Sequence, residues 1–158
     1  MQDEHQRVTR STEVLYSFAG VHNNMMRLIQ RSAVENGLSV PQYSILMALL
    51  SRNEMTQKKV GEKTFLPKST LSQAVDGLVR EGLLRRQPVE GNRREVLLSL
   101  SEKGMTRIRT LHLQEGGIHQ AVQSVLESLT EQQVNDLLRT HKQITDLLEK
   151  GETEEQKK

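Results

Sequence analysis

The fold of this chain is decided by the stretch KSTLSQAVDGLVREGLLRR (residues 68–86) and by GNRREVLLSLSEKG (residues 91–104) after it. Apolar side chains recur in the first stretch at gaps of three and four residues, which is the spacing of a helix with one buried face. They are Leu71, Ala74, Val75, Leu78 and Val79. Gly82 is a typical helix stop. We therefore predict a helix over 68–81 whose opposite face is polar.

A hairpin is predicted to follow this helix, and a shorter helix to precede it. Residues 83–86 and 95–100 have the composition of strands, and residues 87–94 between them contain proline, glycine and asparagine, which favour turns. A helix over 56–64 ends at the break 65–67. Two helices joined by a tight turn form a helix-turn-helix, and a hairpin directly after it is a wing.

A further helix is predicted ahead of this motif. Ser39 is suited to be its N-cap, Gln42 completes a capping box, and Pro41 is tolerated in the first turn. The helix runs to about Leu50. We expect a winged helix-turn-helix domain over 38–101, so the fold class is mainly α with a small β-hairpin wing.

Long helices are predicted at both ends of the chain. The first covers 7–36, and 102–129 is helical with a weak point or kink at Gly116-Gly117, while 131–150 follows a capping box that begins at Thr130. The residues that form one apolar stripe along the first helix are Val8, Leu15, Phe18, His22, Met25, Ile29 and Ala33. The stripe of the last consists of Val134, Leu137, Leu138, His141, Ile144, Leu147 and Leu148.

These stripes are too long for a small winged domain to cover, so we expect a second copy of the chain to bury them. A purely intramolecular bundle is the alternative. The predicted organisation is an N-terminal dimerisation helix over 1–37, the winged domain, C-terminal dimerisation helices over 102–150 and a disordered tail over 151–158.

Composition excludes several classes of protein. The chain has 158 residues, and its longest apolar run is the six residues Ile45 to Leu50, whereas a membrane-spanning helix needs about 20. No signal sequence opens it, so we expect a soluble cytoplasmic protein without a membrane partner. Cysteine is absent, which excludes disulfides, thiolate zinc sites and thiol switches. No nucleophile with a base, carboxylate pair or phosphate-binding glycine loop stands out, so we expect neither an enzyme nor a cofactor.

Positive charge is concentrated in the middle of the chain. Residues 51–103 carry eleven basic and seven acidic side chains, residues 1–50 carry four of each, and residues 104–158 carry seven basic and nine acidic ones. A local basic surplus suggests a polyanionic partner, and an ordinary solvated surface is the alternative.

The polar face of helix 68–81 is a candidate reader of double-stranded DNA. Its residues are Lys68, Ser69, Thr70, Ser72 and Gln73. They lie in the first turns, the part of a recognition helix that enters the major groove. Gln73 is able to pair with adenine, while Lys68 suits a phosphate. The alternative is a merely solvent-exposed polar face.

Four arginines favour the DNA interpretation. Arg93 and Arg94 lie beside Asn92 at the predicted tip of the hairpin, from which arginine reaches a minor groove. Arg85 and Arg86 on the rising strand are placed to hold phosphates. Four arginines within ten residues are hard to explain as ordinary surface.

The remaining candidate sites concern histidine and methionine. We expect His22 and His141 to be buried and hydrogen-bonded, with a ligand contact or a pH-sensitive interface as the alternative. A small-molecule pocket is predicted at His22, Met25, Met26, Tyr43 and Met47, and core filling is the safer interpretation. His112 and His119 are seven residues apart without a carboxylate cluster, so no metal site is predicted.

Three stretches of the chain resemble the MarR family of winged-helix transcriptional regulators. They are LSVPQYSILMALL (38–50), STLSQAVDGLVREGLLRR (69–86) and GNRREVLLSLSEKG (91–104), and the likeness covers about residues 6–150. It implies an obligate homodimer formed by the chain ends, a winged domain in each subunit and often a small-molecule pocket between the two regions. Peroxide-sensing members act through cysteine, so that branch is excluded.

The resemblance also assigns roles to single residues. The wing of such proteins usually carries Asp-x-Arg, which here reads Asn92-Arg93-Arg94, so Arg94 inherits the minor-groove role. Asn92 accepts a hydrogen bond but cannot neutralise an arginine. Asp76 corresponds to a helix aspartate that pairs with a basic neighbour and does not read bases.

The sequence thus predicts a sequence-specific DNA-binding regulator that is a homodimeric repressor of palindromic operators, relieved by a small-molecule effector. The two half-sites are expected to be about one helical turn apart, roughly 10–10.5 bp. The alternative is a winged-helix protein-interaction module without sequence-specific DNA binding.

Overall fold

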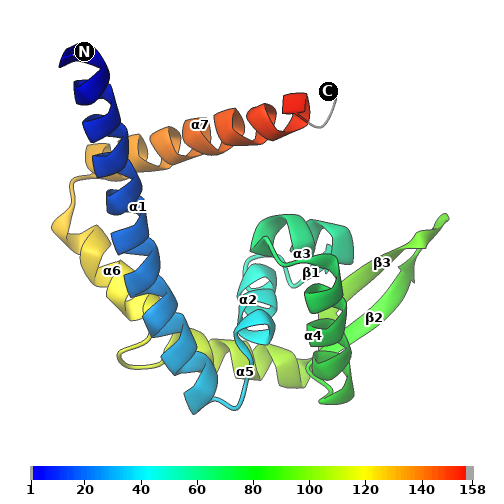
Figure 1. Ribbon diagram of the computed structural model, residues 1–158. Coiled ribbons are helices and arrows are strands. Elements are labelled where there is room, and N and C mark those ends of the chain that lie inside the picture. Colours follow the sequence, from blue (N-terminus) through cyan, green and yellow to red (C-terminus); the bar gives the residue numbers. More distant parts are fainter. Residues whose placement is uncertain (1, 156–158) are drawn as a thin grey trace. The chain divides into compact units, whose positions relative to one another are not determined.

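The computed structural model describes the backbone of residues 2–155 (Figure 1). The elements are α1 (Gln2–Glu35), α2 (Val40–Leu49), β1 (Glu54–Thr56), α3 (Gln57–Thr64), α4 (Lys68–Arg80), β2 (Leu84–Val89), β3 (Asn92–Leu100), α5 (Glu102–His112), α6 (Ile118–Ser128) and α7 (Glu131–Glu155). The predicted class, mainly α with a small hairpin wing, is confirmed. The chain divides into two compact units, and the boundary along the sequence follows His119.

Hydrogen bonds of the predicted kind fix where the helices begin. The Ser39 hydroxyl accepts from the Gln42 N–H at 3.2 Å, and the Gln42 side chain accepts from the Ser39 N–H at 3.0 Å. Thr56 caps α3 by accepting from the Lys59 N–H at 3.3 Å. Thr130 and Gln133 form the same reciprocal pair ahead of α7.

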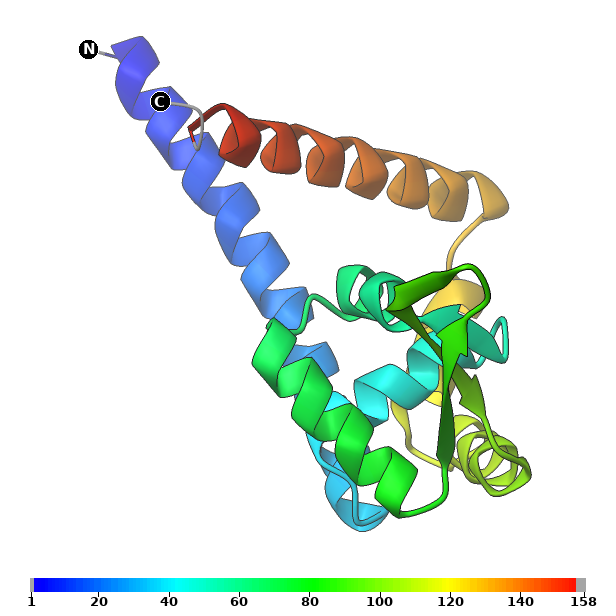
Figure 2. The same ribbon diagram turned by 90° about the vertical axis from the view of Figure 1, so that its right-hand side faces the viewer.

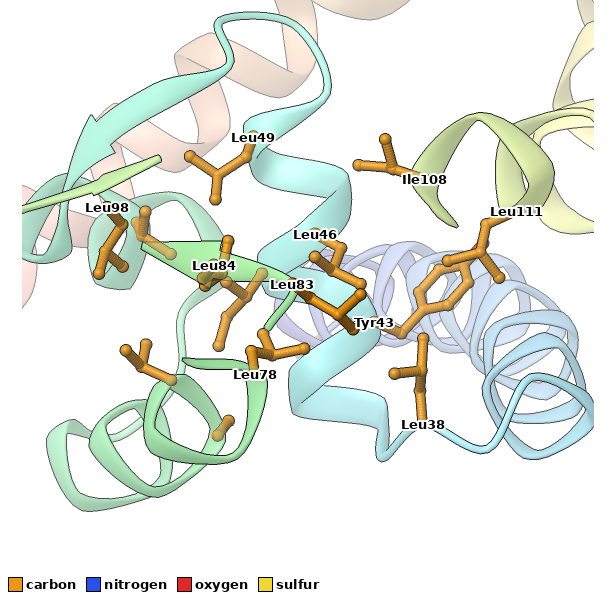
Figure 3. Packing of buried hydrophobic residues seen from close by; sticks show 14 of the residues in the cluster. Leu38, Tyr43, Leu46, Leu49, Leu78, Leu83, Leu84, Leu98, Ile108 and Leu111 are labelled. Carbon is orange, nitrogen blue, oxygen red and sulfur yellow. The ribbon is translucent and has the colours of Figure 1, made fainter. Parts of the chain in front are cut away.

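The core of the first unit is built around α2. Tyr43, Ile45, Leu46 and Leu49 of this helix are all buried. Figure 3 shows Tyr43, Leu46 and Leu49 among Leu78 of α4, the sheet residues Leu84 and Leu98, and Ile108 and Leu111 of α5. Burying side chains of this size contributes roughly 1.5–3 kcal/mol each. The core therefore holds α4 and the wing in fixed positions.

The sheet has three antiparallel strands in the order β1-β3-β2. The sequence did not predict β1, because its three residues are too few to show an alternating pattern, and it forms by pairing with residues 97–99 of β3. The wing is also longer than predicted, since residues 87–89 and 92–94 belong to strands and not to the turn. Pro88 lies in the edge strand β2, where proline without an N–H is tolerated.

The predicted helix over 102–129 is two helices, so the kink expected at Gly116-Gly117 is in fact a break. α5 ends at His112 and α6 begins at Ile118. Gly116 has a φ of 70°, which favours glycine, and its carbonyl accepts a hydrogen bond from Arg31 at 2.5 Å. The connection is therefore held by α1 as well as by its own turn.

The outer bounds of the end helices differ from the prediction too. α1 begins at Gln2 and α7 continues to Glu155, so residues 151–155 are helical where a disordered tail was expected. Residues 156–158 of that predicted tail lie outside the described residues. Among the helices that the structure describes, none is long and apolar enough to cross a membrane.

A tight joint connects the wing to α5. The Ser101 hydroxyl donates to the Gly82 carbonyl at 2.5 Å and accepts from the Gly104 N–H at 2.9 Å. A Cβ atom on Gly104 would lie 2.0 Å from the Leu83 carbonyl oxygen. Only glycine fits there, so the start of α5 packs directly on the chain that leaves α4.

Apolar side chains are exposed on helices of both units. On α1 they are Val8, Val14, Leu15, Tyr16, Phe18, Val21, Met25 and Val34; on α6 and α7 they are Val122, Val125, Leu126, Leu137, Leu138, Leu147 and Leu148. His22 and His141 are exposed as well. The prediction that these two histidines are buried is therefore wrong for the single chain.

Candidate nucleic-acid interface

Helix α4 presents the predicted polar face to solvent. Its apolar residues Leu71, Ala74, Val75 and Leu78 are buried. The predicted reading residues fall on the other side: Lys68, Ser69 and Gln73 are exposed, and Thr70 and Ser72 are half-buried. The Ser72 hydroxyl accepts from the Gln57 side-chain amide of α3 at 3.5 Å. Within the described part of the chain, the side chains of the other four residues make no comparable hydrogen bond to the protein.

The start of α4 also leaves backbone donors available. Pro67 is the N-cap residue, and no side chain in the described part of the protein caps the helix. The preceding helix α3 is followed by its C-cap Phe65, whose φ of 56° lies in the left-handed region. The first N–H groups of a helix have no intrahelical partner, so they are able to bind an anion there.

The wing carries its arginines on exposed positions. Arg85, Arg86, Arg93 and Arg94 are all exposed. Figure 1 shows the β2–β3 hairpin projecting beyond the helices of its unit, and in Figure 2 the hairpin faces the viewer. The Arg94 N–H donates to the Asn92 side-chain oxygen at 3.1 Å. Asn92 therefore uses its acceptor to shape the backbone that carries Arg94.

Asp76 of α4 and Arg86 of β2 form an ion pair, with 2.6 Å between Oδ1 and Nη2. This is the pairing with a basic neighbour that the family resemblance implied for Asp76. The ion pair occupies one nitrogen of the Arg86 guanidinium, the group that was predicted to hold a phosphate. The guanidinium has five N–H donors, so the pair leaves some of them for a second acceptor.

A hollow of about 490 Å³ joins the starts of α3 and α4 to the wing. Lys58, Lys68, Arg94 and Glu95 line it, together with Gln57. Three cationic side chains against one carboxylate make this surface positive. The sequence prediction omitted Gln57 and Lys58, although a lysine pair at 58–59, one residue beyond the position that follows the N-cap Thr56, is a signal of a basic helix start.

The predicted ligand-pocket residues do not line this hollow or a second one of about 590 Å³ beside Asn36 and Arg107. Tyr43 is buried, and burial raises the pKa of its phenol, with the neighbouring Ser32 acting in the opposite direction. Met26 and Met47 are half-buried, while His22 and Met25 are exposed.

Comparison with known proteins agrees with this geometry. A family model described as the MarR family matches residues 36–95, from the end of α1 to the start of β3. This segment of the chain is similar to the MarR family. Among its relatives is the organic hydroperoxide resistance transcriptional regulator of Bacillus subtilis, 36% identical over 67 residues. The match covers 42% of this chain and 46% of the relative, so it spans about half of that protein.

Solved structures of similar fold cover more of the chain. AbfR in its reduced form bound to DNA has a TM-score of 0.68 and 15% identity, over 94% of this chain and 99% of AbfR. PcaV of Streptomyces coelicolor in complex with its natural ligand has a TM-score of 0.61 and 26% identity, over 82% of this chain and 89% of PcaV. The relatives bear the names of transcriptional regulators, in agreement with the non-enzymatic prediction.

Proposed function

We propose that this protein is a MarR-family regulator that acts as a homodimeric, sequence-specific DNA-binding repressor of palindromic operators. One observation carries the proposal: the uncapped, polar start of α4 and the arginine-bearing wing border one positive hollow. A recognition helix reads base edges with its first turns, while basic residues beside it neutralise phosphates. AbfR has the same fold and was solved bound to DNA.

The exposed residues of α4 divide into readers and anchors. Gln73 reads adenine in the major groove, and Ser69 and Thr70 reach base edges or phosphates. Lys68 binds a phosphate beside the free N–H groups of the first turn. Ser72, which accepts from Gln57, contributes by fixing the distance between α3 and α4 as well as by direct contact.

The wing supplies the minor-groove contact. Arg94 enters the groove, because its backbone is set by Asn92, and Arg93 beside it reaches a flanking phosphate. Arg85 and the donors of Arg86 not used by Asp76 hold the phosphates nearer the helix. These contacts do not distinguish sequences strongly, so they add affinity and fix the orientation of α4.

A second copy of the chain covers the exposed apolar side chains of α1, α6 and α7. On α7, for example, Leu138 is 64% exposed and Leu148 69% exposed in the single chain, which is unfavourable for so many neighbouring apolar groups. A twofold dimer presents two copies of α4, which matches a palindromic site. Such a protein acts in the compartment that holds the DNA, the cytoplasm of a bacterium.

A small-molecule effector relieves repression by favouring a dimer whose two recognition helices have another spacing. PcaV was solved with its natural ligand, so the fold accommodates one. The residues that we assign to the effector are His22, Met25, Met26, Tyr43 and Met47, of which Tyr43 and the two half-buried methionines supply the apolar surface.

Selection of bound duplexes from a random pool tests this function. We expect an enriched palindrome whose half-sites are about one turn apart, and an affinity that falls by roughly 10³–10⁵ between about 50 and 200 mM salt for six to ten phosphate contacts. Sedimentation of the free protein is expected to give a dimer. Failure to enrich any sequence, with weak salt dependence, would instead support a protein-interaction module.

A further inference from the structure

Three side chains with soft or borderline donor atoms meet where α2 contacts the α5–α6 connection. The Nε2 atom of His119 lies 2.8 Å from the Sδ atom of Met47. The rings of His112 and His119 have their centroids 4.4 Å apart. Two imidazoles and a thioether from three separate elements therefore converge at one point of the first unit.

The break between α5 and α6 creates this arrangement. Along one continuous helix, residues seven apart are separated by about 10.5 Å along the axis. Here α5 ends at His112 and α6 begins at Ile118, one residue before His119. The intervening turn folds the two rings together, which is why the spacing in the sequence gave no indication of a shared site.

The chemistry of the donors selects a class of ion. No group of three or more His, Cys, Asp or Glu in the described residues is placed to hold a metal, so a hard or strongly charged cation finds few ligands. A thioether and neutral imidazoles suit a soft ion of low charge such as Cu(I).

We propose that Met47, His112 and His119 form a binding site for Cu(I). A trigonal ion with bonds of about 2.0 Å to nitrogen and about 2.3 Å to sulfur separates those two donors by about 3.7 Å. The present separation is smaller, and the three rotatable bonds of Met47 allow the thioether to move outward. The exposed ring of His112 is free to turn toward the same ion.

Competition for Cu(I) under anaerobic, reducing conditions tests the site on the full chain. The protein is titrated against the chromophoric chelator bicinchoninate, and Ag(I) serves as a redox-inert probe of the Met47 methyl and histidine ring signals by NMR. We expect one tightly held Cu(I) per chain. The chain has no cysteine, so no thiolate contributes to the retained metal.

Variants decide whether these three residues are the ligands. Met47→Leu, His112→Gln and His119→Gln are each expected to weaken Cu(I) retention by about tenfold or more. The matched controls Met105→Leu and His5→Gln should retain it. His112 is exposed, so its variant is informative even if a change at Met47 disturbs folding.

Two results would overturn the proposal. One is a wild-type chain that loses Cu(I) to the chelator as readily as the His112→Gln variant does. The other is tight Zn(II) binding that needs both histidines and is unchanged in Met47→Leu, because that would exclude the thioether from the site. The readout is metal retention, so it is independent of whether the protein binds DNA.

Discussion

Asp76 and Arg86 link the outward face of α4 to the base of the wing through a contact of 2.6 Å between Oδ1 and Nη2. The Arg86 side chain is 40% exposed and that of Asp76 51% exposed, so solvent screens the pair. We expect the pair to contribute less than about 1 kcal/mol to stability. A double-mutant cycle with Asp76→Ala and Arg86→Ala in urea measures this coupling, and a value well above that range would mean that the pair is structural.

Replacing Arg94 with alanine should weaken binding to a selected duplex by roughly 1–3 kcal/mol and lower the salt slope by about one. The reason is loss of the arginine that we place in the minor groove. Fluorescence anisotropy across a salt series measures both quantities. Arg109→Ala removes the same charge from an exposed position on α5, and binding as weak in that control as in Arg94→Ala would point to net charge alone.

Two substitutions at Asn92 should affect DNA binding differently: aspartate should make it more specific and alanine should weaken it. Asn92→Asp keeps an acceptor for the Arg94 N–H and adds a charge that pairs with an arginine of the wing, so we expect binding with higher sequence specificity. Asn92→Ala removes the acceptor and should weaken binding by about 1 kcal/mol. Anisotropy with the selected duplex and a scrambled one tests this; unchanged affinity and salt dependence in Asn92→Asp would make the substitution irrelevant.

The helices were predictable where their signals are local. The capping boxes at Ser39 and Thr130 and the N-cap Thr56 fixed three helix starts to the residue, because each signal lies within four residues of chain. The polar face of α4 was equally readable, since helical spacing separates Leu71 and Leu78 from Gln73.

Features that depend on distant contacts were not predictable. Strand β1 exists because β3 lies beside it, and Pro88 obscured how far the wing extends. The closeness of Met47, His112 and His119 depends on the turn between α5 and α6 and on the packing of α2. His22 and His141 lie on apolar stripes, but the sequence does not show whether the same chain or a second copy packs against such a stripe.

Adding a methyl group at Gly104 should destabilise the fold. The new Cβ would meet the Leu83 carbonyl oxygen at 2.0 Å, and a backbone atom cannot rotate away, so we expect a loss of about 1–3 kcal/mol in urea unfolding. Gly151→Ala is the control, because nothing lies within 4 Å of that position on α7. It should be neutral or raise stability by up to about 1 kcal/mol. Equal stability of the two variants would contradict the tight joint.

Stability should decrease as the pH falls below neutrality, in part through His119. Burial, and secondarily the charge of His112, hold the pKa of His119 below its ordinary value of 6.5. The unfolded chain therefore takes up a proton at a higher pH than the folded chain does. The contribution of neutral His119 to the free energy of unfolding is complete above pH 6.5. It is lost as the pH falls through the lower pKa of this residue in the folded state.

Urea unfolding between about pH 7.5 and 5 tests this dependence in the wild type and in His119→Gln. The variant should show a shallower loss of stability toward acid. His5→Gln, at an exposed position of α1, is the control and should keep the wild-type slope. Identical slopes in wild type and His119→Gln would rule out a role for this ring.

The proline in the outer strand of the wing has a consequence for how the protein behaves when crowded. An exposed edge strand is a template on which a strand from another molecule can add, and that is a route to aggregation. Pro88 has no N–H for such pairing, and the neighbouring Arg85 and Arg86 add like charges along the same strand β2. A hairpin long enough to reach outward therefore does not readily pair with the wing of another molecule, even at high protein concentration.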